Sequence, residues 1–114
     1  MVCMIRGEIY YADLNPTRGS ETNKTRPVLV ISNNANNKYS DTVTVIPITS
    51  NIKKVYPFEV MILKERSGLQ KDSKVQCHQI RTISKVRITG DVIGFLKEGE
   101  VRSIEVALRM HLDL

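Results

Sequence analysis

Helical periodicity is confined to the C-terminal end of this chain of 114 residues, and that confinement restricts the fold more than any other feature. Between residues 98 and 112, apolar side chains recur at the three- and four-residue spacing of one helical face: Val101, Ile104, Ala107, Leu108 and Leu112. The spacing predicts an amphipathic helix from about Glu98 to Leu112, with His111 packed on its apolar stripe. The residues before this helix must fold in another way.

Short runs rich in β-branched and apolar residues, bounded by turn residues, make up most of the rest of the chain. We predict strands at Glu8–Asp13, Pro27–Ile31, Thr42–Ile46, Phe58–Leu63, Ser73–His78, Ile80–Thr82 and Arg87–Ile93. Because proline lacks a backbone N–H, Pro27 is expected to open its strand and Pro47 to follow the end of the next one. Many short strands and one terminal helix predict a mainly β protein with α, a single domain over residues 1–114 built on a small, bent antiparallel sheet or barrel.

Two segments lack the pattern of a strand. Residues 14–25 form a long predicted loop with Pro16 and Gly19, and loops of this length in compact domains are often functional. Residues 32–41 hold four asparagines, which predicts a turn.

Charge and composition exclude several classes of protein. The chain has 17 lysines and arginines against 12 acidic residues, a net charge of +5, so its expected partners are anionic, nucleic acid among them. With no tryptophan and two phenylalanines, a large aromatic platform for single strands is not expected. No apolar run is long enough to span a membrane, and the N-terminal apolar run is too short for a signal peptide. Cys3 and Cys77 are expected to be reduced thiols of a cytoplasmic protein.

Standard catalytic and metal-binding motifs are absent from the sequence. It has no phosphate-binding glycine-rich loop, no His-Glu-x-x-His and no Gly-x-Ser-x-Gly. The spacing of His78, His111 and the two cysteines matches no zinc site, which favours a structural role for His78. The sequence therefore predicts neither a metal ion nor another cofactor.

Polar side chains adjoin the ends of several predicted strands. Arg26 directly precedes one apolar run, and Thr49 and Ser50 follow another. Strand ends gather at the rim of a barrel, where a guanidinium and a hydroxyl can together hold a phosphate and stabilise it as negative charge develops. The alternative is that Arg26 is an ordinary solvated or ion-paired surface residue, and the residues alone favour that alternative.

Five motifs, taken in order, resemble those of one protein family. They are Gly7-Glu8-Ile9-Tyr10-Tyr11-Ala12-Asp13-Leu14-Asn15-Pro16, Gly19-Ser20-Glu21, the segment from Thr25 to Asn33, Pro47-Ile48-Thr49-Ser50 and Gln79-Ile80-Arg81-Thr82-Ile83. Together they resemble the MazF/PemK family of toxin endoribonucleases. The resemblance runs from about Arg6 to Leu112.

The resemblance implies an SH3-like barrel of the MazF/CcdB type with a C-terminal helix, acting as a cytoplasmic homodimer. It also implies metal-independent cleavage of single-stranded RNA to 2′,3′-cyclic phosphate and 5′-OH ends, and neutralisation by a cognate acidic antitoxin. The family's catalytic residues correspond to Arg26 and Thr49. The positions expected to bind RNA are Ser20, Glu21, Ser50, His78, Gln79 and Arg81. Many relatives carry an acidic residue where this chain has His78, so the role of that position is open.

Two other functions remain open on the same fold. One is a toxin that poisons gyrase through its C-terminal residues, and the other is a catalytically weakened member that only holds an antitoxin. The presence of both Arg26 and Thr49 argues for the nuclease, because a protein that only binds another protein needs neither. DNA binding, if any, would belong to the toxin–antitoxin complex.

Overall fold

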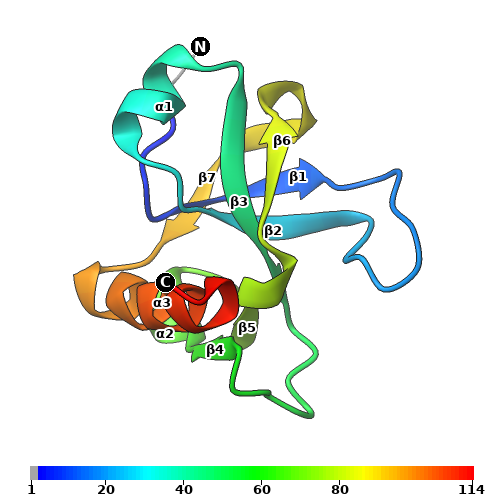
Figure 1. The fold of residues 1–114 in the computed structure, drawn as a ribbon, viewed down its shortest axis with the longest axis vertical. Helices are drawn as coiled ribbons and strands as arrows, with labels where there is room; N and C mark the ends of the chain where they lie inside the picture. Colours follow the sequence, from blue (N-terminus) through cyan, green and yellow to red (C-terminus); the bar gives the residue numbers. More distant parts are fainter. Residues whose placement is uncertain (1–2) are drawn as a thin grey trace.

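The computed structural model describes residues 3–114, which form one antiparallel sheet with helices packed around it (Figure 1). The strands are β1 (Glu8–Asp13), β2 (Thr25–Val30), β3 (Thr42–Thr49), β4 (Glu59–Ile62), β5 (Ser73–Gln76), β6 (Arg81–Ser84) and β7 (Ile88–Phe95). The helices are α1 (Asn34–Tyr39), α2 (Lys64–Ser67) and α3 (Glu98–Leu112), with 3₁₀ turns η1 (Cys77–Gln79) and η2 (Lys85–Arg87). The strand order is β4-β5-β3-β2-β1-β7, and β6 pairs with β3.

Strand β3 bends and changes partners along its length. Its first residues pair with β6, residues Val45 to Pro47 pair with β2, and Ile48 and Thr49 pair with β5. Pro47 therefore lies inside the strand, opposite Val28, and the prediction that it follows the strand end is wrong. Proline is tolerated there because β3 has a strand neighbour on only one side at Pro47.

Pro27 also lies inside a strand, at a different position from the one predicted. It is the third residue of β2 rather than the first, opposite Tyr11 of β1. Pairing of β2 with β3 begins only at Val28. A residue without an N–H is thus again placed where the strand has one neighbour.

Side chains that alternate along the strands fill two cores, one on each side of the bent sheet. The core beneath α3 contains Ile9, Leu29, Ile46, Ile48, Ile62 and Val75, and the helix closes it with Ile104 and Ala107. The other core contains Tyr10, Ala12, Leu14, Val28, Val30, Val43, Val45 and Ile83. The same strands contribute to both cores, and the sheet between the cores is strongly bent, as the sequence predicts.

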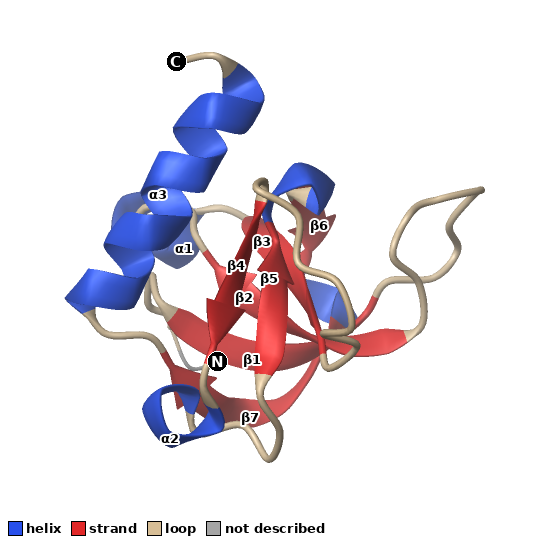
Figure 2. Ribbon diagram, turned by 90° about the horizontal axis from the view of Figure 1, so that it is seen from below, coloured by secondary structure: helices blue, strands red, loops and turns tan. Residues whose placement is uncertain are grey.

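The predicted C-terminal helix is confirmed with its bounds, but the predicted packing of His111 is wrong. Val101 and Leu108 are half-buried, Ile104 and Ala107 are buried, and His111 is exposed. The last turns of α3 extend past the edge of the sheet (Figure 2). The apolar periodicity therefore continues beyond the surface that the helix covers.

The asparagine-rich segment forms a short helix and not only the predicted turn. Asn33 caps α1 because its side chain accepts a hydrogen bond from the amide of Asn36 at 2.8 Å. Asn37 is fully buried and donates to the carbonyl of Ser32 at 2.9 Å. The asparagines thus cap and anchor a short helix. The number of asparagines in a segment does not distinguish such a helix from a turn.

Helix α2 approaches strand β7 closely at Gly94. A Cβ atom at Gly94 would lie 2.1 Å from the carbonyl oxygen of Ser67, so only glycine fits there. This contact fixes the position of α2 and of the turn after it, residues 68–72. No helix among residues 3–114 is long and apolar enough to cross a bilayer.

Candidate active site

Arg26 lies on β2, opposite Ala12 of β1, and lines a surface hollow of about 240 Å³. Its Nε donates to the carbonyl of Asn23 at 3.0 Å, which holds the side chain against the end of the β1–β2 loop. Within residues 3–114 the terminal guanidinium nitrogens make no hydrogen bond or ion pair, so they remain available for an anion. Tyr11, Pro27, Ser50 and Leu69 line the same hollow.

Thr49 lies just beyond the ladder that joins the strand of Arg26 to β3. The β2–β3 ladder ends at the pair Val28 and Pro47, two residues short of Arg26 and Thr49. Thr49 pairs with Lys74 of β5 instead. The residues that line the Arg26 hollow do not include Thr49.

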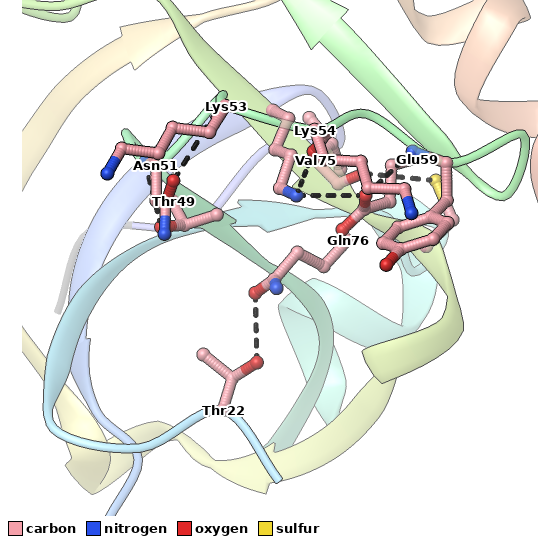
Figure 3. A network of polar contacts seen from close by, with 11 residues as sticks. Thr22, Thr49, Asn51, Lys53, Lys54, Glu59, Val75 and Gln76 are labelled. Atoms are coloured by element: carbon pink, nitrogen blue, oxygen red, sulfur yellow. Dashed lines mark hydrogen bonds and ion pairs between the residues drawn. The ribbon is translucent and has the colours of Figure 1, made fainter. Parts of the chain in front are cut away.

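Thr49 is half-buried at the point where β3 ends. Its Oγ1 accepts a hydrogen bond from the backbone amide of Asn51 at 3.2 Å (Figure 3). That contact orients the oxygen and leaves the hydroxyl proton free to be donated. Ser50, the next residue, lies in the hollow with Arg26.

A second hollow, of about 230 Å³, collects most of the remaining residues predicted to bind RNA. Glu21 from the β1–β2 loop lines it together with His78, Gln79 and Arg81 from the η1–β6 segment. Ser20 adjoins it, because the side-chain amide of Gln79 donates to the Ser20 carbonyl at 3.1 Å. The structure thus divides the predicted set in two, with Arg26 and Ser50 in one hollow and these five residues at the other.

The side chain of Gln79 holds the β1–β2 loop in place through two hydrogen bonds. Besides the bond to Ser20, its side-chain oxygen accepts from the amide of Thr22 at 3.2 Å. Gln76 adds a third contact, accepting from the hydroxyl of Thr22 at 2.9 Å (Figure 3). Both ends of the Gln79 amide are therefore engaged within the protein, and its side chain positions the loop in the free protein.

Two arginines hold the base of the same loop. Arg81 donates to the carbonyl of Leu14 at 3.2 Å, and Arg87 donates to the carbonyls of Asp13, at 3.1 Å, and Asn15. At the tip the carboxylate of Glu21 accepts from the amide of Arg18 at 2.8 Å. The loop projects from the sheet (Figures 1 and 2). Sequence reasoning missed Gln76 and Arg87, because no local pattern connects them to a loop more than fifty residues away.

His78 has both an aromatic neighbour and charged neighbours. Its ring lies edge-on to Phe58, with centroids 4.4 Å apart, and its Nδ1 is buried without a hydrogen-bond partner among the described residues. Burial lowers the pKa of His78 below its usual value, His111 and Lys74 lower it further, and Glu59 opposes them. His78 is therefore neutral at pH 7 and brings a ring, not a charge, to the hollow.

A buried ion pair fixes the loop that begins at Thr49. The Nζ of Lys74 lies 2.9 Å from Oε1 of Glu59 and donates to the Lys54 carbonyl at 2.7 Å. The same carboxylate oxygen accepts from the amide of Tyr56 at 3.0 Å. Burial acts to raise the pKa of Glu59, but the Tyr56 amide and Lys74 outweigh it and hold that pKa below its usual value. The β3–β4 loop, residues 50–58, is thereby tied to β5 (Figure 3).

Cysteine and metal chemistry have little support in the described part of the chain. Residues 3–114 hold no group of three or more histidine, cysteine or acidic side chains that could bind a metal ion. Cys3 is exposed and Cys77 is buried, and neither forms a disulfide. Burial raises the pKa of Cys77 to about 11, which keeps this thiol protonated and unreactive at pH 7.

Known proteins are similar to this chain in sequence and in fold. A family model described as PemK-like, MazF-like toxin of type II toxin–antitoxin system matches residues 5–112. The endoribonuclease MazF9 of Mycobacterium tuberculosis is 45% identical over 116 aligned residues, which cover 97% of this chain and 98% of the relative.

Solved structures extend the comparison to three dimensions. A mycobacterial endoribonuclease in complex with its cognate antitoxin has a TM-score of 0.78 at 26% identity, covering 100% of this chain and 97% of that one. MazF from Deinococcus radiodurans has a TM-score of 0.86 at 22% identity, with both chains fully covered, a likeness that concerns the fold alone. The predicted fold class, mainly β and antiparallel with a C-terminal helix, is confirmed.

Proposed function

The chain belongs to the PemK-like, MazF-like toxin family of type II toxin–antitoxin systems, and from this premise we propose that it is an endoribonuclease that cleaves single-stranded RNA without a metal ion. The ribose 2′-OH attacks the adjacent phosphorus, the bond from phosphorus to the 5′ oxygen breaks, and the products carry a 2′,3′-cyclic phosphate and a 5′-OH. The 2′-OH loses a proton and the leaving oxygen gains one. We also propose that the protein acts in the cytoplasm, where RNA of this class is found.

Arg26 supplies the charge that this reaction needs. As the phosphorus becomes five-coordinate, negative charge grows on its non-bridging oxygens, and a guanidinium stabilises it with two parallel N–H donors. A guanidinium does not give up its proton in proteins, so Arg26 acts electrostatically. The free hydroxyl proton of Thr49 is donated to a third phosphate oxygen or orients the 2′-OH.

The observation that carries this proposal is the hollow in which Arg26, whose terminal guanidinium nitrogens have no partner among residues 3–114, lies with Ser50, the residue after Thr49. Its direct test is to incubate the purified protein with end-labelled RNA in EDTA and to sequence the new 5′ ends. Cleavage at a short recurring sequence is expected, and it should persist in EDTA because the proposed reaction uses the 2′-OH of the RNA and the charge of Arg26. A strict requirement for Mg²⁺ would contradict the metal-independent reaction.

An acidic, partly disordered segment of a cognate antitoxin is expected to inhibit the enzyme by covering the RNA-binding surface. The related mycobacterial endoribonuclease was solved with its antitoxin. Exposed Lys53, Lys54 and Lys71 flank the Arg26 hollow or the loop after Thr49, and a surface that attracts phosphates also attracts carboxylates. Lys74 does not contribute, because it is buried against Glu59.

Competition and salt dependence test this inhibition. Inhibition should weaken as salt is raised from about 50 to 200 mM, since exposed charges are screened within a Debye length of roughly 10 Å, and antitoxin peptide and RNA should displace each other. Titrations of the peptide against cleavage at two salt concentrations measure both effects. Salt-independent inhibition, with RNA bound equally well to the complex and the free enzyme, would rule out a shared surface.

The protein is expected to be a homodimer. A chain of 114 residues buries a limited core, and large apolar side chains such as Val86, Met110 and Leu114 stay exposed in the single chain. A symmetric dimer is the commonest way to bury such surface. Light scattering at micromolar concentration should give twice the mass of the chain, and a stable monomer there would count against the dimer.

A further inference from the structure

Three rings form a row at the end of the β3–β4 loop. Tyr56 and Phe58 stack with centroids 5.2 Å apart and planes 4° from parallel. Phe58 in turn meets the edge of His78, with centroids 4.4 Å apart. The rings come from the loop and from η1, so the row forms only in the folded chain. We call Tyr56, Phe58 and His78 the ring row.

The outer end of the ring row is exposed and basic. Tyr56 is 41% exposed, whereas Phe58 and His78 are half-buried. The Nζ of Lys54 lies over the Tyr56 ring, 4.7 Å from its centre, and Lys53 is also exposed. When the flexible Lys54 side chain turns to a phosphate, the ring offers a stacking face for a base and the lysines offer cations for the backbone, the two features by which proteins hold single-stranded nucleic acid.

The Tyr56 ring is already held in place. Its backbone amide donates to the buried Glu59, and the Lys54 carbonyl accepts from Lys74. Phe58 supports the ring from one side. When a ligand stacks on Tyr56, little side-chain conformational entropy is therefore lost, and preorganisation of this kind strengthens binding.

The ring row is connected to both parts of the candidate active site. Its inner end, His78, lines the hollow with Glu21, Gln79 and Arg81. The loop that carries its outer end follows Thr49, the proposed catalytic hydroxyl (Figure 3). An RNA strand that runs from the cleavage site along this loop meets Tyr56.

From this arrangement we propose that Tyr56 is an RNA-binding residue that stacks one base of the substrate flanking the cleaved bond, while Lys54 pairs with a neighbouring phosphate. The inference rests on the proposed function, which supplies the RNA. It extends the RNA-binding surface beyond the two hollows. Stacking accepts any base, so Tyr56 adds affinity and register without adding sequence specificity.

The test uses an RNA that contains the cleavage sequence, with a 2′-deoxyribose at the cut so that it binds without reacting. Each flanking nucleotide is replaced in turn by an abasic one, and Kd is measured by fluorescence anisotropy. With the wild-type protein, one abasic position is expected to weaken binding about 10-fold. Tyr56→Ala should weaken binding of the intact RNA by the same factor, and the abasic position should then have no further effect.

Matched variants separate stacking from folding and from exposure. Tyr56→Phe keeps the ring and should bind RNA as the wild type does, whereas Tyr56→Leu keeps an apolar side chain and should bind as Tyr56→Ala does. Tyr39→Ala removes another exposed tyrosine, which also has a lysine over its ring but lies on α1, and should have no effect. Thermal melting confirms that each variant is folded.

Two results would overturn the inference while leaving the proposed function intact. One is that Tyr56→Ala binds every RNA as tightly as the wild type. The other is that only binding of an acidic antitoxin peptide changes, which would make the ring row a protein-binding surface. A wild-type protein that neither binds nor cleaves RNA would overturn the proposed function itself, and the inference with it.

Discussion

Replacing Arg26 with alanine is expected to slow RNA cleavage by about 10²–10³-fold, because one preorganised donor to a developing oxyanion is lost. The fold should be unchanged, since Arg26 is only half-buried and its one side-chain hydrogen bond among residues 3–114 is to a loop carbonyl, that of Asn23. Single-turnover cleavage and thermal melting, measured on the same preparation, separate the two effects. Thr49→Ala should also be slow, and Thr49→Ser, which keeps the hydroxyl, should retain more activity.

A matched control for this variant is Arg102→Ala. Arg102 is exposed on α3, and within the described part of the chain its one ion pair is with Glu98, one helical turn away, at 2.8 Å. The Arg102→Ala variant therefore loses the same positive charge as Arg26→Ala, but away from the hollow, and it should cleave RNA at the wild-type rate. A folded Arg26→Ala protein with the wild-type rate would remove Arg26 from the catalytic machinery.

Replacing Lys74 with methionine is expected to destabilise the protein by about 3–5 kcal/mol, the usual cost of leaving one member of a buried ion pair without its partner. The side chain of Glu59 is 3% exposed and that of Lys74 is 10% exposed. Methionine keeps the apolar stem of lysine and removes the ammonium that neutralises Glu59. Denaturant unfolding at a fixed protein concentration measures the loss, because an oligomer's stability depends on concentration.

The double variant Lys74→Met with Glu59→Gln should recover most of that stability. Glutamine is uncharged, and its side-chain oxygen can still accept from the amide of Tyr56, as Glu59 does now. If the single and double variants are equally destabilised, the loss comes from packing and not from the unpaired charge.

Acid should destabilise the wild type through the same pair. The pKa of Glu59 is lowered in the folded state, so the stability it contributes is complete above its unfolded value of about 4.5 and is lost as pH falls through the folded value. His78 adds to this trend at higher pH, because its pKa also lies below the unfolded value of 6.5. For both groups the unfolded chain binds more protons, and stability falls as the solution becomes more acid.

Strand and helix positions follow closely from the sequence because their signals are local. Alternating β-branched residues located the strands, and the three- and four-residue spacing located α3 with its observed ends. The errors arose where tertiary contacts decide. Pro47 lies inside its strand because β3 changes its partner strand at that point. His111 is exposed because the last turns of α3 extend past the edge of the sheet.

The candidate site was predictable only in part for the same reason. Arg26, Thr49 and Ser50 adjoin strand ends that the local pattern shows. The Lys74–Glu59 pair and the stacked Tyr56 depend on which strands become neighbours, and no spacing in the sequence carries that information. The few aromatic residues argue against a large stacking platform, yet three rings from two segments lie in one row.

The chemistry of the product ends distinguishes attack by the 2′-OH of the RNA from attack by water. RNA cleaved by the purified protein in EDTA should give one product with a 2′,3′-cyclic phosphate and one with a 5′-OH, as measured by mass spectrometry. These ends require attack by the 2′-OH of the RNA itself, the reaction assigned here to Arg26 and Thr49. Products with 5′-phosphate ends would mean that water attacks instead, and would contradict the account.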